Sequence, residues 1–277
     1  MKFLLIAISF AMLAVSCSHS RPYVYHRQTH ELLHSVLWMQ RSAEYRAACE
    51  TVYLGAFAEL ERALSDTTWS AATEQQPPFG RKPPAIIVDV DETVLDNSPY
   101  EARLVLDGSS YPMRWDEWCC EEKAPALPGA VEFLREADRR GVAIFYVTNR
   151  DVKLDECTWR NLRAQGFPQT ATAEQVMTKD EREGWGSDKS TRREYISRSH
   201  RVIQIAGDNL DDFVGYKKST DERDGLANQY SAWWGTRWLM LPNPAYGSWE
   251  RALLNYDNTI SDSVALRKKY DALRPER

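Results

Sequence analysis

Residues 85–97 read AIIVDVDETVLDN, in which a short apolar run ends at two aspartates one residue apart. The run follows a Pro-Pro pair and is rich in β-branched residues, which predicts a buried strand over residues 85–88. Side chains two apart on a strand point the same way, so Asp89 and Asp91 should project together. Two carboxylates at this range repel each other unless a cation lies between them. The pattern therefore predicts a cation-dependent site at the end of a core strand.

Further segments have the character of core strands that end in polar residues. They are residues 142–147, which lead into TNR, residues 202–206, which lead into GDNLDDF, and RWLMLPNP at 237–244. We expect helices over residues 31–64, 128–140 and 151–166. Strands separated by helices indicate an α/β fold with a parallel sheet, in which ligands bind at the carboxyl ends of the strands. The polar clusters fall at those ends.

The N-terminus has the features of an export signal. Lys2 precedes a mainly apolar stretch of thirteen residues, 3–15, which is short for a membrane span and suits a signal peptide. The following LAVSC resembles a bacterial lipobox, which predicts a signal peptide over residues 1–16 and lipidation at Cys17. Ordinary cleavage nearby, an uncleaved anchor and a buried helix are the alternatives.

The remaining chain divides into three predicted parts: a lipidated tether (17–28), an N-terminal helical segment with its linker (29–84), and a core domain with cap-like helical decorations (85–277). The net charge of −5, with both signs spread along the chain, gives no indication of a groove for a nucleic acid polymer.

Four further cysteines show no metal-binding spacing: Cys49, Cys119, Cys120 and Cys157. An exported chain can form disulfides, but sequence does not pair these residues. The adjacent Cys119 and Cys120 are poorly placed to bond each other. We treat all four as structural.

The polar clusters contain carboxylates, hydroxyls and a lysine, and no histidine lies near them. Oxygen ligands of this kind suit a hard cation such as Mg²⁺, whereas zinc and copper favour histidine or cysteine. A carboxylate beside such an ion can attack phosphorus, and nearby cations then neutralise the phosphoryl oxygens. The residue types therefore predict phosphoryl transfer.

Four motifs in order, DVDETVLDN, VTNR, a following lysine and GDNLDDF, resemble those of the haloacid dehalogenase (HAD) superfamily of phosphohydrolases. More narrowly, IIVDVDETVLDNSPY, IAGDNLDDF and LPNPAYGSWE resemble the class C acid phosphatases, a family of 5′-nucleotidase lipoproteins. The resemblance covers nearly all of the predicted mature chain. It implies a HAD-like Rossmannoid sheet flanked by helices, with a smaller, mainly helical part from the N-terminal region and insertions.

The resemblance also implies roles for individual residues. Asp89 would be the nucleophile and a metal ligand, and Asp91 the general acid and base, with its backbone carbonyl on the metal. Thr148 and Lys189 would bind the phosphoryl oxygens, and Asn149 would add a backbone contact. Asp208 would bind the metal directly. Asp212 would support the metal from outside its ligand shell or orient Lys189. Lys179 is the alternative to Lys189.

Neighbouring polar residues have plainer expected roles. We expect Asp211 to be an exposed helix residue, Asp96 and Asn97 to form a turn, and Arg150 to pair with Asp151 or cap the turn. Trp115 and Tyr246 lie in loop-like segments that resemble the base-stacking aromatics of the family. Burial of both rings in the core is the alternative for these two.

Taken together, these features predict a Mg²⁺-dependent acid phosphatase that acts on small phosphomonoesters such as nucleoside monophosphates through an aspartyl-phosphate. The N-terminal features predict an exported protein that a lipid anchors in a bacterial membrane. The outer membrane is favoured because Ser18, rather than an aspartate, follows Cys17. The oligomeric state, including a homodimer, is left open. The alternative function is a non-catalytic surface lipoprotein that binds haem or another ligand, or an adhesin, on the same fold.

Overall fold

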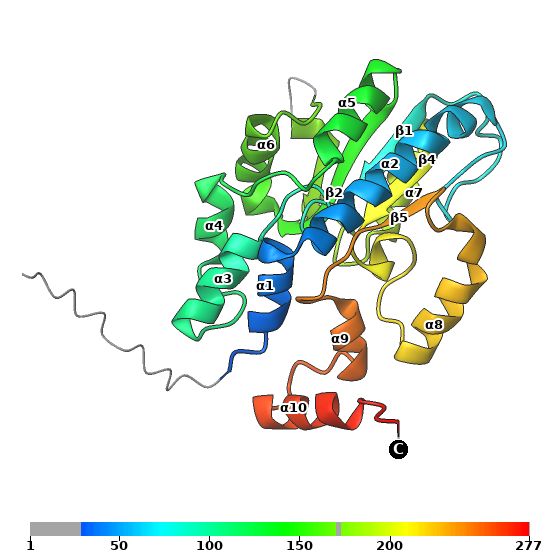
Figure 1. Ribbon diagram of the computed structural model, residues 1–277. Coiled ribbons are helices and arrows are strands. Elements are labelled where there is room, and N and C mark those ends of the chain that lie inside the picture. Colours follow the sequence, from blue (N-terminus) through cyan, green and yellow to red (C-terminus); the bar gives the residue numbers. More distant parts are fainter. Residues whose placement is uncertain (1–28, 170–172, 277) are drawn as a thin grey trace, which may run out of the picture.

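The structure is a computed structural model that describes residues 29–169 and 173–276. In this part of the chain a five-stranded parallel sheet has the order β3-β2-β1-β4-β5 (Figure 1). The strands are β1 (Pro84–Val88), β2 (Ala143–Asp151), β3 (Val176–Lys179), β4 (Arg201–Gly207) and β5 (Trp238–Met240). The predicted α/β fold with a parallel sheet is confirmed. The short β3, which follows a 3-10 turn, was not predicted.

Helices cover both faces of the sheet, which explains why its strands are apolar on both sides. Ile86 and Val88 of β1 pack in one cluster with α2 (Ala43–Ser65), α5 (Ala130–Arg139) and α6 (Asp155–Ala164). Ala85 and Ile87 pack in the other with α7 (Ser190–Ser199) and α8 (Thr220–Gln229). Asp89 therefore emerges from the middle of a two-sided core.

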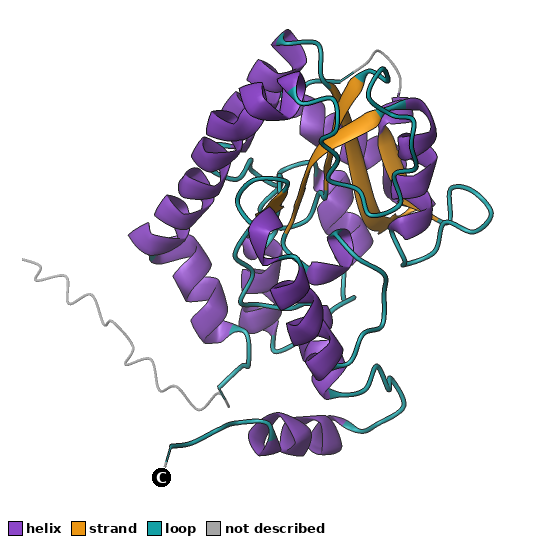
Figure 2. Ribbon diagram, turned by 90° about the vertical axis from the view of Figure 1, so that its right-hand side faces the viewer, coloured by secondary structure: helices purple, strands orange, loops and turns teal. Residues whose placement is uncertain are grey.

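The single helix predicted over residues 31–64 is wrong: the segment forms two helices, α1 (Leu33–Arg41) and α2. Ser42 between them has an extended backbone, and its hydroxyl accepts a hydrogen bond from the Tyr45 amide at 3.0 Å. A serine in this position caps the helix that follows it. Figure 2 shows α1 and α2 in succession along one side of the molecule, with α1 extending beyond the sheet.

The remaining helices gather near the carboxyl ends of the strands or at the C-terminus. They are α3 (Ser98–Asp107), α4 (Trp115–Glu121), α9 (Ser248–Leu253) and α10 (Asp262–Asp271). Single 3-10 turns are η1 (Val152–Leu154), η2 (Ala173–Gln175), η3 (Leu210–Asp212) and η4 (Ser231–Trp233). The helix predicted over 151–166 thus begins with η1 before α6, and the helix predicted over 128–140 is α5.

The strand predicted over residues 142–147 continues as β2 as far as Asp151. Its pairing with β3 changes register between Val147 and Asp151. A bulge of this kind re-aims the side chains within it. Thr148, Asn149 and Arg150 lie in this irregular part of the strand.

A disulfide joins Cys120 of α4 to Cys157 of α6, with a Cα–Cα distance of 4.9 Å. Cys49 and Cys119 are buried thiols. Across the described ranges, the helices are each too short or too polar to cross a membrane. The predicted signal peptide, Cys17 and the tether lie outside the described residues, so these assignments and the proposed division into domains stay predictions.

Candidate active site

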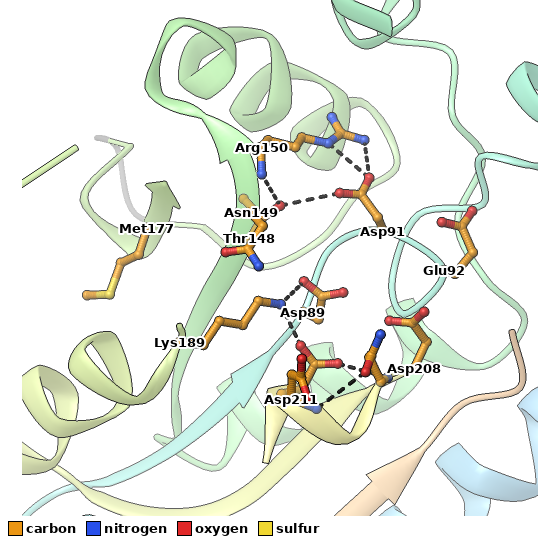
Figure 3. Close-up of polar contacts among 12 residues, drawn as sticks. Asp89, Asp91, Glu92, Thr148, Asn149, Arg150, Met177, Lys189, Asp208 and Asp211 are labelled. Atoms are coloured by element: carbon orange, nitrogen blue, oxygen red, sulfur yellow. Dashed lines mark hydrogen bonds and ion pairs between the residues drawn. The ribbon is translucent and has the colours of Figure 1, made fainter. Parts of the chain in front are cut away.

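Lys189 lies between two carboxylates at the centre of the site. Its Nζ donates a hydrogen bond to the carboxylate of Asp89, the residue that follows β1 (Figure 3). It also donates to Oδ1 of Asp212 at 2.6 Å, and Asp212 belongs to η3 after β4. All three side chains are buried. Lys189 is the residue before α7, so the start of this helix delivers a cation to the carboxyl edge of the sheet.

Lys179, the alternative lysine, is at the end of β3 and pairs with Asp151 at 2.6 Å. The structure therefore brings Lys189, rather than Lys179, to the aspartates. Asp151 is thereby occupied by a lysine and is not the partner of Arg150 that we expected.

Asp208 completes a cluster of three acids. Oxygen atoms of Asp89, Asp208 and Asp212 all lie within 4.8 Å of one another. Asn243, in the segment after β5, donates to Asp208 Oδ2 at 2.7 Å and so fixes its orientation. The cluster is drawn from the ends of β1 and β4, which are neighbours in the sheet.

The acids of the cluster raise one another's affinity for protons. Burial raises the pKa of Asp89 to about 7 against the opposing effect of Lys189, and Asp212 and Asp91 add to the rise. Burial also raises the pKa of Asp208 well above its ordinary value, with Asp212 and Asp89 contributing. Burial lowers the pKa of Lys189, but Asp212 and Asp89 outweigh it and the net shift is upward. The positive charge of Lys189 alone therefore does not balance the negative charge of the clustered carboxylates.

This donor set fits a hard divalent cation. Within the described residues, the cluster contains carboxylate oxygens and neither histidine nor cysteine, which is the chemistry that Mg²⁺ prefers. Asp89, Asp208 and Asp212 are the side chains that would hold the ion. The Asp91 carboxylate is outside the cluster, which is compatible with the backbone role that the resemblance implies for it.

Gly207 at the end of β4 allows Asp212 to approach the sheet. A Cβ atom at position 207 would lie 2.3 Å from Asp212 Oδ2 and 2.5 Å from Asp212 Cβ. Asp212 Oδ2 also accepts from the Asn209 amide at 3.0 Å, which closes the turn. The sequence GDNLDD thus combines a glycine that leaves room with two aspartates that the turn brings back together.

Asp91 is held apart from the cluster of three acids by a second set of donors. Arg150 donates from Nε at 3.0 Å and Nη2 at 2.8 Å to Asp91 Oδ1 (Figure 3). Asn97 Nδ2 donates to the same oxygen at 2.8 Å, and the Thr148 hydroxyl donates to Oδ2 at 3.3 Å. The Asp91 side chain keeps 18% of its surface exposed. It is therefore fixed and still accessible.

Two of these donors differ from the sequence-based expectation. Arg150 is buried and pairs with Asp91, so the predicted pairing with Asp151 is wrong. Asn97 is fully buried and bridges Asp91 and Trp118, whose indole N–H donates to Asn97 Oδ1 at 2.8 Å; it is therefore more than a turn former. Asp96 does form a turn, since its carboxylate accepts from the Ser98 amide at 2.7 Å.

Asp211 also departs from expectation, because it is buried rather than an exposed helix residue. Its carboxylate accepts from Arg223 Nη1 of α8 at 2.8 Å and from the Ser248 hydroxyl of α9. Two hydrogen-bonding partners compensate for the loss of water around the buried charge. Asp211 thus fastens two helices to the turn that carries Asp212.

The loops that carry Thr148 and Lys189 are braced by Arg192, which is fully buried in α7. Its guanidinium donates to the backbone oxygens of Thr148, Met177 and Gly186 and to Asn149 Oδ1 at 2.6 Å. Burial lowers the pKa of Arg192 to about 10, while Asp89 and Asp212 oppose that shift. Asn149 in turn donates to the Ser187 carbonyl at 3.0 Å.

The acids open into a cavity of about 1640 Å³ whose wall includes Trp115 and Tyr246. Trp115 makes edge contacts with Tyr100 and Tyr111, at 5.0 and 5.8 Å between ring centroids, and Arg150 lies 5.4 Å from its ring. The Tyr246 hydroxyl donates to Glu92, which is fully buried. Both rings are partly buried, so each faces the cavity and also contacts the core.

Sequence reasoning missed Arg192 and Asn243, and it gave Asn97 and Arg150 plainer roles than they have in the site. Each acts through a side chain that reaches another segment, and single-residue propensities carry no signal for such contacts. The motifs that contain them, DNSPY, VTNR, STRRE and LPNP, were the available signal.

Comparisons with known proteins agree on one family. The family model described as HAD superfamily, subfamily IIIB (Acid phosphatase) matches residues 12–249. The crystal structure of the class C acid phosphatase from Bacillus anthracis with tungstate bound is similar, with a TM-score of 0.80 and 35% identity over 89% of this chain and 98% of that chain. Among curated relatives, a stem 31 kDa glycoprotein of Glycine max is 30% identical over 165 residues, and acid phosphatase 1 of Solanum lycopersicum is 28% identical over 163 residues.

The alignments with the two plant proteins span 58% and 57% of their lengths. The family model and the bacterial structure extend over most of the present chain and include all four motifs. On this evidence the chain belongs to the HAD superfamily, subfamily IIIB, the acid phosphatases.

Proposed function

We propose that the protein hydrolyses small phosphomonoesters, 5′-nucleotides among them, in a Mg²⁺-dependent reaction that passes through a phosphorylated Asp89. The observation that carries the proposal is the separation of two carboxylates that share one motif. Asp89 lies with Lys189 and the other acids of the cluster, while Asp91 lies 2.8 Å from Arg150 on the opposite side. This separation supports attack by one carboxylate and proton transfer by the other.

The proposed first step is attack of an Asp89 carboxylate oxygen on phosphorus. The bond from phosphorus to the ester oxygen breaks, and protonated Asp91 gives its proton to that departing oxygen. In the second step Asp91, now a carboxylate, takes a proton from water while the water oxygen attacks phosphorus. Asp89 is regenerated, inorganic phosphate leaves, and Asp91 is again protonated.

Lys189 and the Thr148 hydroxyl lie on either side of the aspartates and would hold the phosphoryl oxygens through both steps. Mg²⁺ bound to Asp89, Asp208 and Asp212 would supply further positive charge to the phosphoryl group, since electrostatic stabilisation dominates this reaction class. The requirement that Asp91 be protonated predicts an acidic optimum.

The aromatic part of the cavity supports nucleotides as substrates. Trp115 and Tyr246 both face the cavity that contains Asp89 and Lys189. An aromatic face stacks on any nucleobase at a gain of about 1–3 kcal/mol per stack, with little discrimination among bases. We therefore propose broad use of nucleoside monophosphates.

The test is release of phosphate from adenosine 5′-monophosphate and 4-nitrophenyl phosphate at acidic pH. We expect activity with Mg²⁺, none after chelation, and recovery when Mg²⁺ is restored. Asp89→Asn should lose several orders of magnitude in kcat, because removal of a nucleophile leaves only the residual binding and electrostatic effects. Asp208→Asn should require more Mg²⁺ for half of its maximal rate. Activity indifferent to chelator, or a phosphopeptide without Asp89, would contradict the proposal.

The alternative, a non-catalytic ligand-binding lipoprotein, predicts folded protein that releases no phosphate under any of these conditions. The retention of Asp89, Asp91, Lys189 and Asp208 in one cluster of motifs argues against it. The same assay separates the two functions.

We also propose that the chain is exported and held at the outer membrane by a lipid on Cys17. The support is the sequence alone: the apolar stretch 3–15, the LAVSC motif and Ser18. Labelling cells with a fatty-acid analogue should tag the wild type and not Cys17→Ala. Equal labelling of both would remove the anchor from the proposal.

A further inference from the structure

Glu101 is a buried carboxyl group that the proposed reaction does not use. It lies in the first turn of α3, and only 4% of the residue is exposed. Among the described residues, no hydrogen-bond donor or cation contacts its carboxylate, and burial is the sole cause of its shifted pKa. Burial of a polar group without a partner costs free energy, so such a group calls for an explanation.

Glu101 belongs to the wall of the cavity that contains the catalytic acids. On α3, Glu101, Val105 and Asp107 line it, so residues from the first to the last turn of this helix face the cavity. On α1, Ser35 and Trp38 line the same cavity. The two helices are tied together at one end, where His30 Nε2 contacts the Ser109 carbonyl at 2.9 Å. The carboxyl thus faces the part of the cavity that lies between two helices.

The position of Glu101 along α3 places it on the proton-donor side of the site. Its amide donates to the Asn97 carbonyl at 3.1 Å, and the Asn97 side chain donates to Asp91. Glu101 is therefore four residues, about 6 Å along the helix axis, from the residue that holds the general acid. Asp91 serves the departing oxygen of the ester, whereas Lys189 and Asp89 serve the phosphoryl group. A carboxyl beyond Asp91 is placed to meet the alcohol part of the substrate.

We propose that Glu101 is a specificity-determining residue that hydrogen-bonds to hydroxyl groups of the alcohol part of the substrate. The inference rests on the proposed function, because it assumes a phosphomonoester in the same cavity. The hydroxyl groups of a polyhydroxylated alcohol, such as a ribose, would supply the hydrogen-bonding partner that the carboxyl lacks. Esters with a purely apolar alcohol would leave it unpaired and should be poorer substrates.

The chemistry of the group favours a neutral hydroxyl over a cationic amine. Burial raises the pKa of Glu101 to about 7, so in the acidic range the carboxyl is protonated. A protonated carboxyl both donates and accepts hydrogen bonds, as a sugar hydroxyl does, and gains little from a positive charge.

The experiment compares kcat/KM for adenosine 5′-monophosphate, its 2′,3′-dideoxy analogue and 4-nitrophenyl phosphate in four proteins. These are the wild type, Glu101→Leu, Glu101→Gln and Asp107→Asn. Leucine removes hydrogen bonding at similar size, and glutamine keeps it. Asp107 is an exposed carboxylate that lines the same cavity from the last turn of α3, so its variant controls for a general effect of acidic charge in the wall.

We expect the wild type to prefer the ribose ester over the dideoxy ester by about ten- to a hundredfold. Glu101→Leu should abolish that preference, mainly through KM, and Glu101→Gln should retain part of it. Asp107→Asn should keep it in full. The loss on adenosine 5′-monophosphate in Glu101→Leu should exceed the loss on the nitrophenyl ester at least tenfold.

Equal losses on all three substrates, or a preference that survives Glu101→Leu, would overturn the assignment while the proposed function stood. A wild-type preference for phosphoethanolamine that Glu101→Gln lost would overturn the choice of hydroxyl over amine. Failure of the wild type to release phosphate from the nitrophenyl ester would overturn both proposals. Leucine removes a buried unpaired carboxyl, so this variant should fold at least as stably as the wild type.

Discussion

Arg150 donates two hydrogen bonds from one guanidinium to a single oxygen of Asp91, at 3.0 and 2.8 Å, while its third nitrogen, Nη1, donates to the Thr158 hydroxyl at 3.2 Å. The arginine is itself buried, and Trp115 covers it at 5.4 Å. The other oxygen of Asp91 accepts a hydrogen bond from Thr148 at 3.3 Å. The orientation of the proposed general acid is therefore set by side chains from β2 and α6 as well as by its own loop.

The first prediction concerns this pair. Arg150→Lys keeps the charge but loses the forked geometry, so Asp91 should be less well oriented. Because proton donation matters most for a poor leaving group, kcat for a nucleotide should fall about tenfold or more beyond the fall for 4-nitrophenyl phosphate. Asp91→Ala should show the same pattern with larger losses. Steady-state rates on the two substrates provide the measurement, and equal losses would assign Arg150 a purely structural part.

A second prediction concerns Arg192, which braces the phosphoryl side of the site. A lysine there cannot reach the Thr148 carbonyl, Asn149 Oδ1 and the Gly186 carbonyl together. Arg192→Lys should therefore lower kcat/KM by a similar factor on nucleotide and nitrophenyl esters and weaken inhibition by inorganic phosphate about tenfold. If the remaining folded enzyme bound phosphate as tightly as the wild type, the bracing role would be excluded and only reduced stability would remain.

The third prediction is a dependence of stability on pH. The pKa of Glu101 is 4.5 ordinarily and about 7 in the folded protein, so the folded state keeps this proton to higher pH than the unfolded state. Ionisation of Glu101 therefore lowers the free energy of unfolding progressively as pH rises from about 4.5 to about 7, and this loss stays constant at higher pH. The full difference is on the order of 3 kcal/mol.

Urea unfolding of the wild type and Glu101→Gln measures this difference directly. The two should be close in free energy of unfolding near pH 5, and the variant should be the more stable at pH 8. The histidines of the adjoining wall, His30 and His34, are the same in both proteins, so their titration cancels. A gap that stayed constant from pH 5 to pH 8 would show that Glu101 does not titrate in this range.

The fourth prediction concerns the disulfide, which closes a loop of 37 residues between α4 and α6. Closing a loop of this length stabilises a protein by about 3–4 kcal/mol in the chain-entropy description. Cys120→Ser with Cys157→Ser should lower the free energy of unfolding by that order. A reductant should destabilise the wild type and leave the double variant unchanged. Equal sensitivity of both proteins to reductant would show that the stabilisation lost on reduction does not come from the Cys120–Cys157 bond.

The sequence predicts the strands that carry the acids well, because each is a local run of apolar residues that ends in charge. Asp89, Asp208 and Lys189 could be proposed from that pattern and from the order of the motifs. The contacts of Asn97, Asn243 and Arg150 could not, since they depend on which rotamer reaches across from another segment. The family and the parallel fold are confirmed, whereas the individual catalytic roles stay predictions.

Two other errors have simple physical origins. The apolar pattern predicts one helix that runs through Ser42, although the hydroxyl of this residue caps α2. The sequence predicts an exposed Asp211 and no role for Glu101, because acidic side chains in helices usually face water. Their burial is decided by what packs on them: α8 and α9 around Asp211, and α1 opposite Glu101.

The bend at Ser42 has a consequence for where the protein works. Because α1 turns away from α2 and lines the cavity, the described part of the chain begins, at Thr29, on the wall of the active-site cavity. If Cys17 carries a lipid, the eleven residues from 18 to 28 span at most about 40 Å when fully extended. The cavity would then stay within that height of the bilayer surface, and substrates would be met in the thin layer of solvent beside the lipid headgroups.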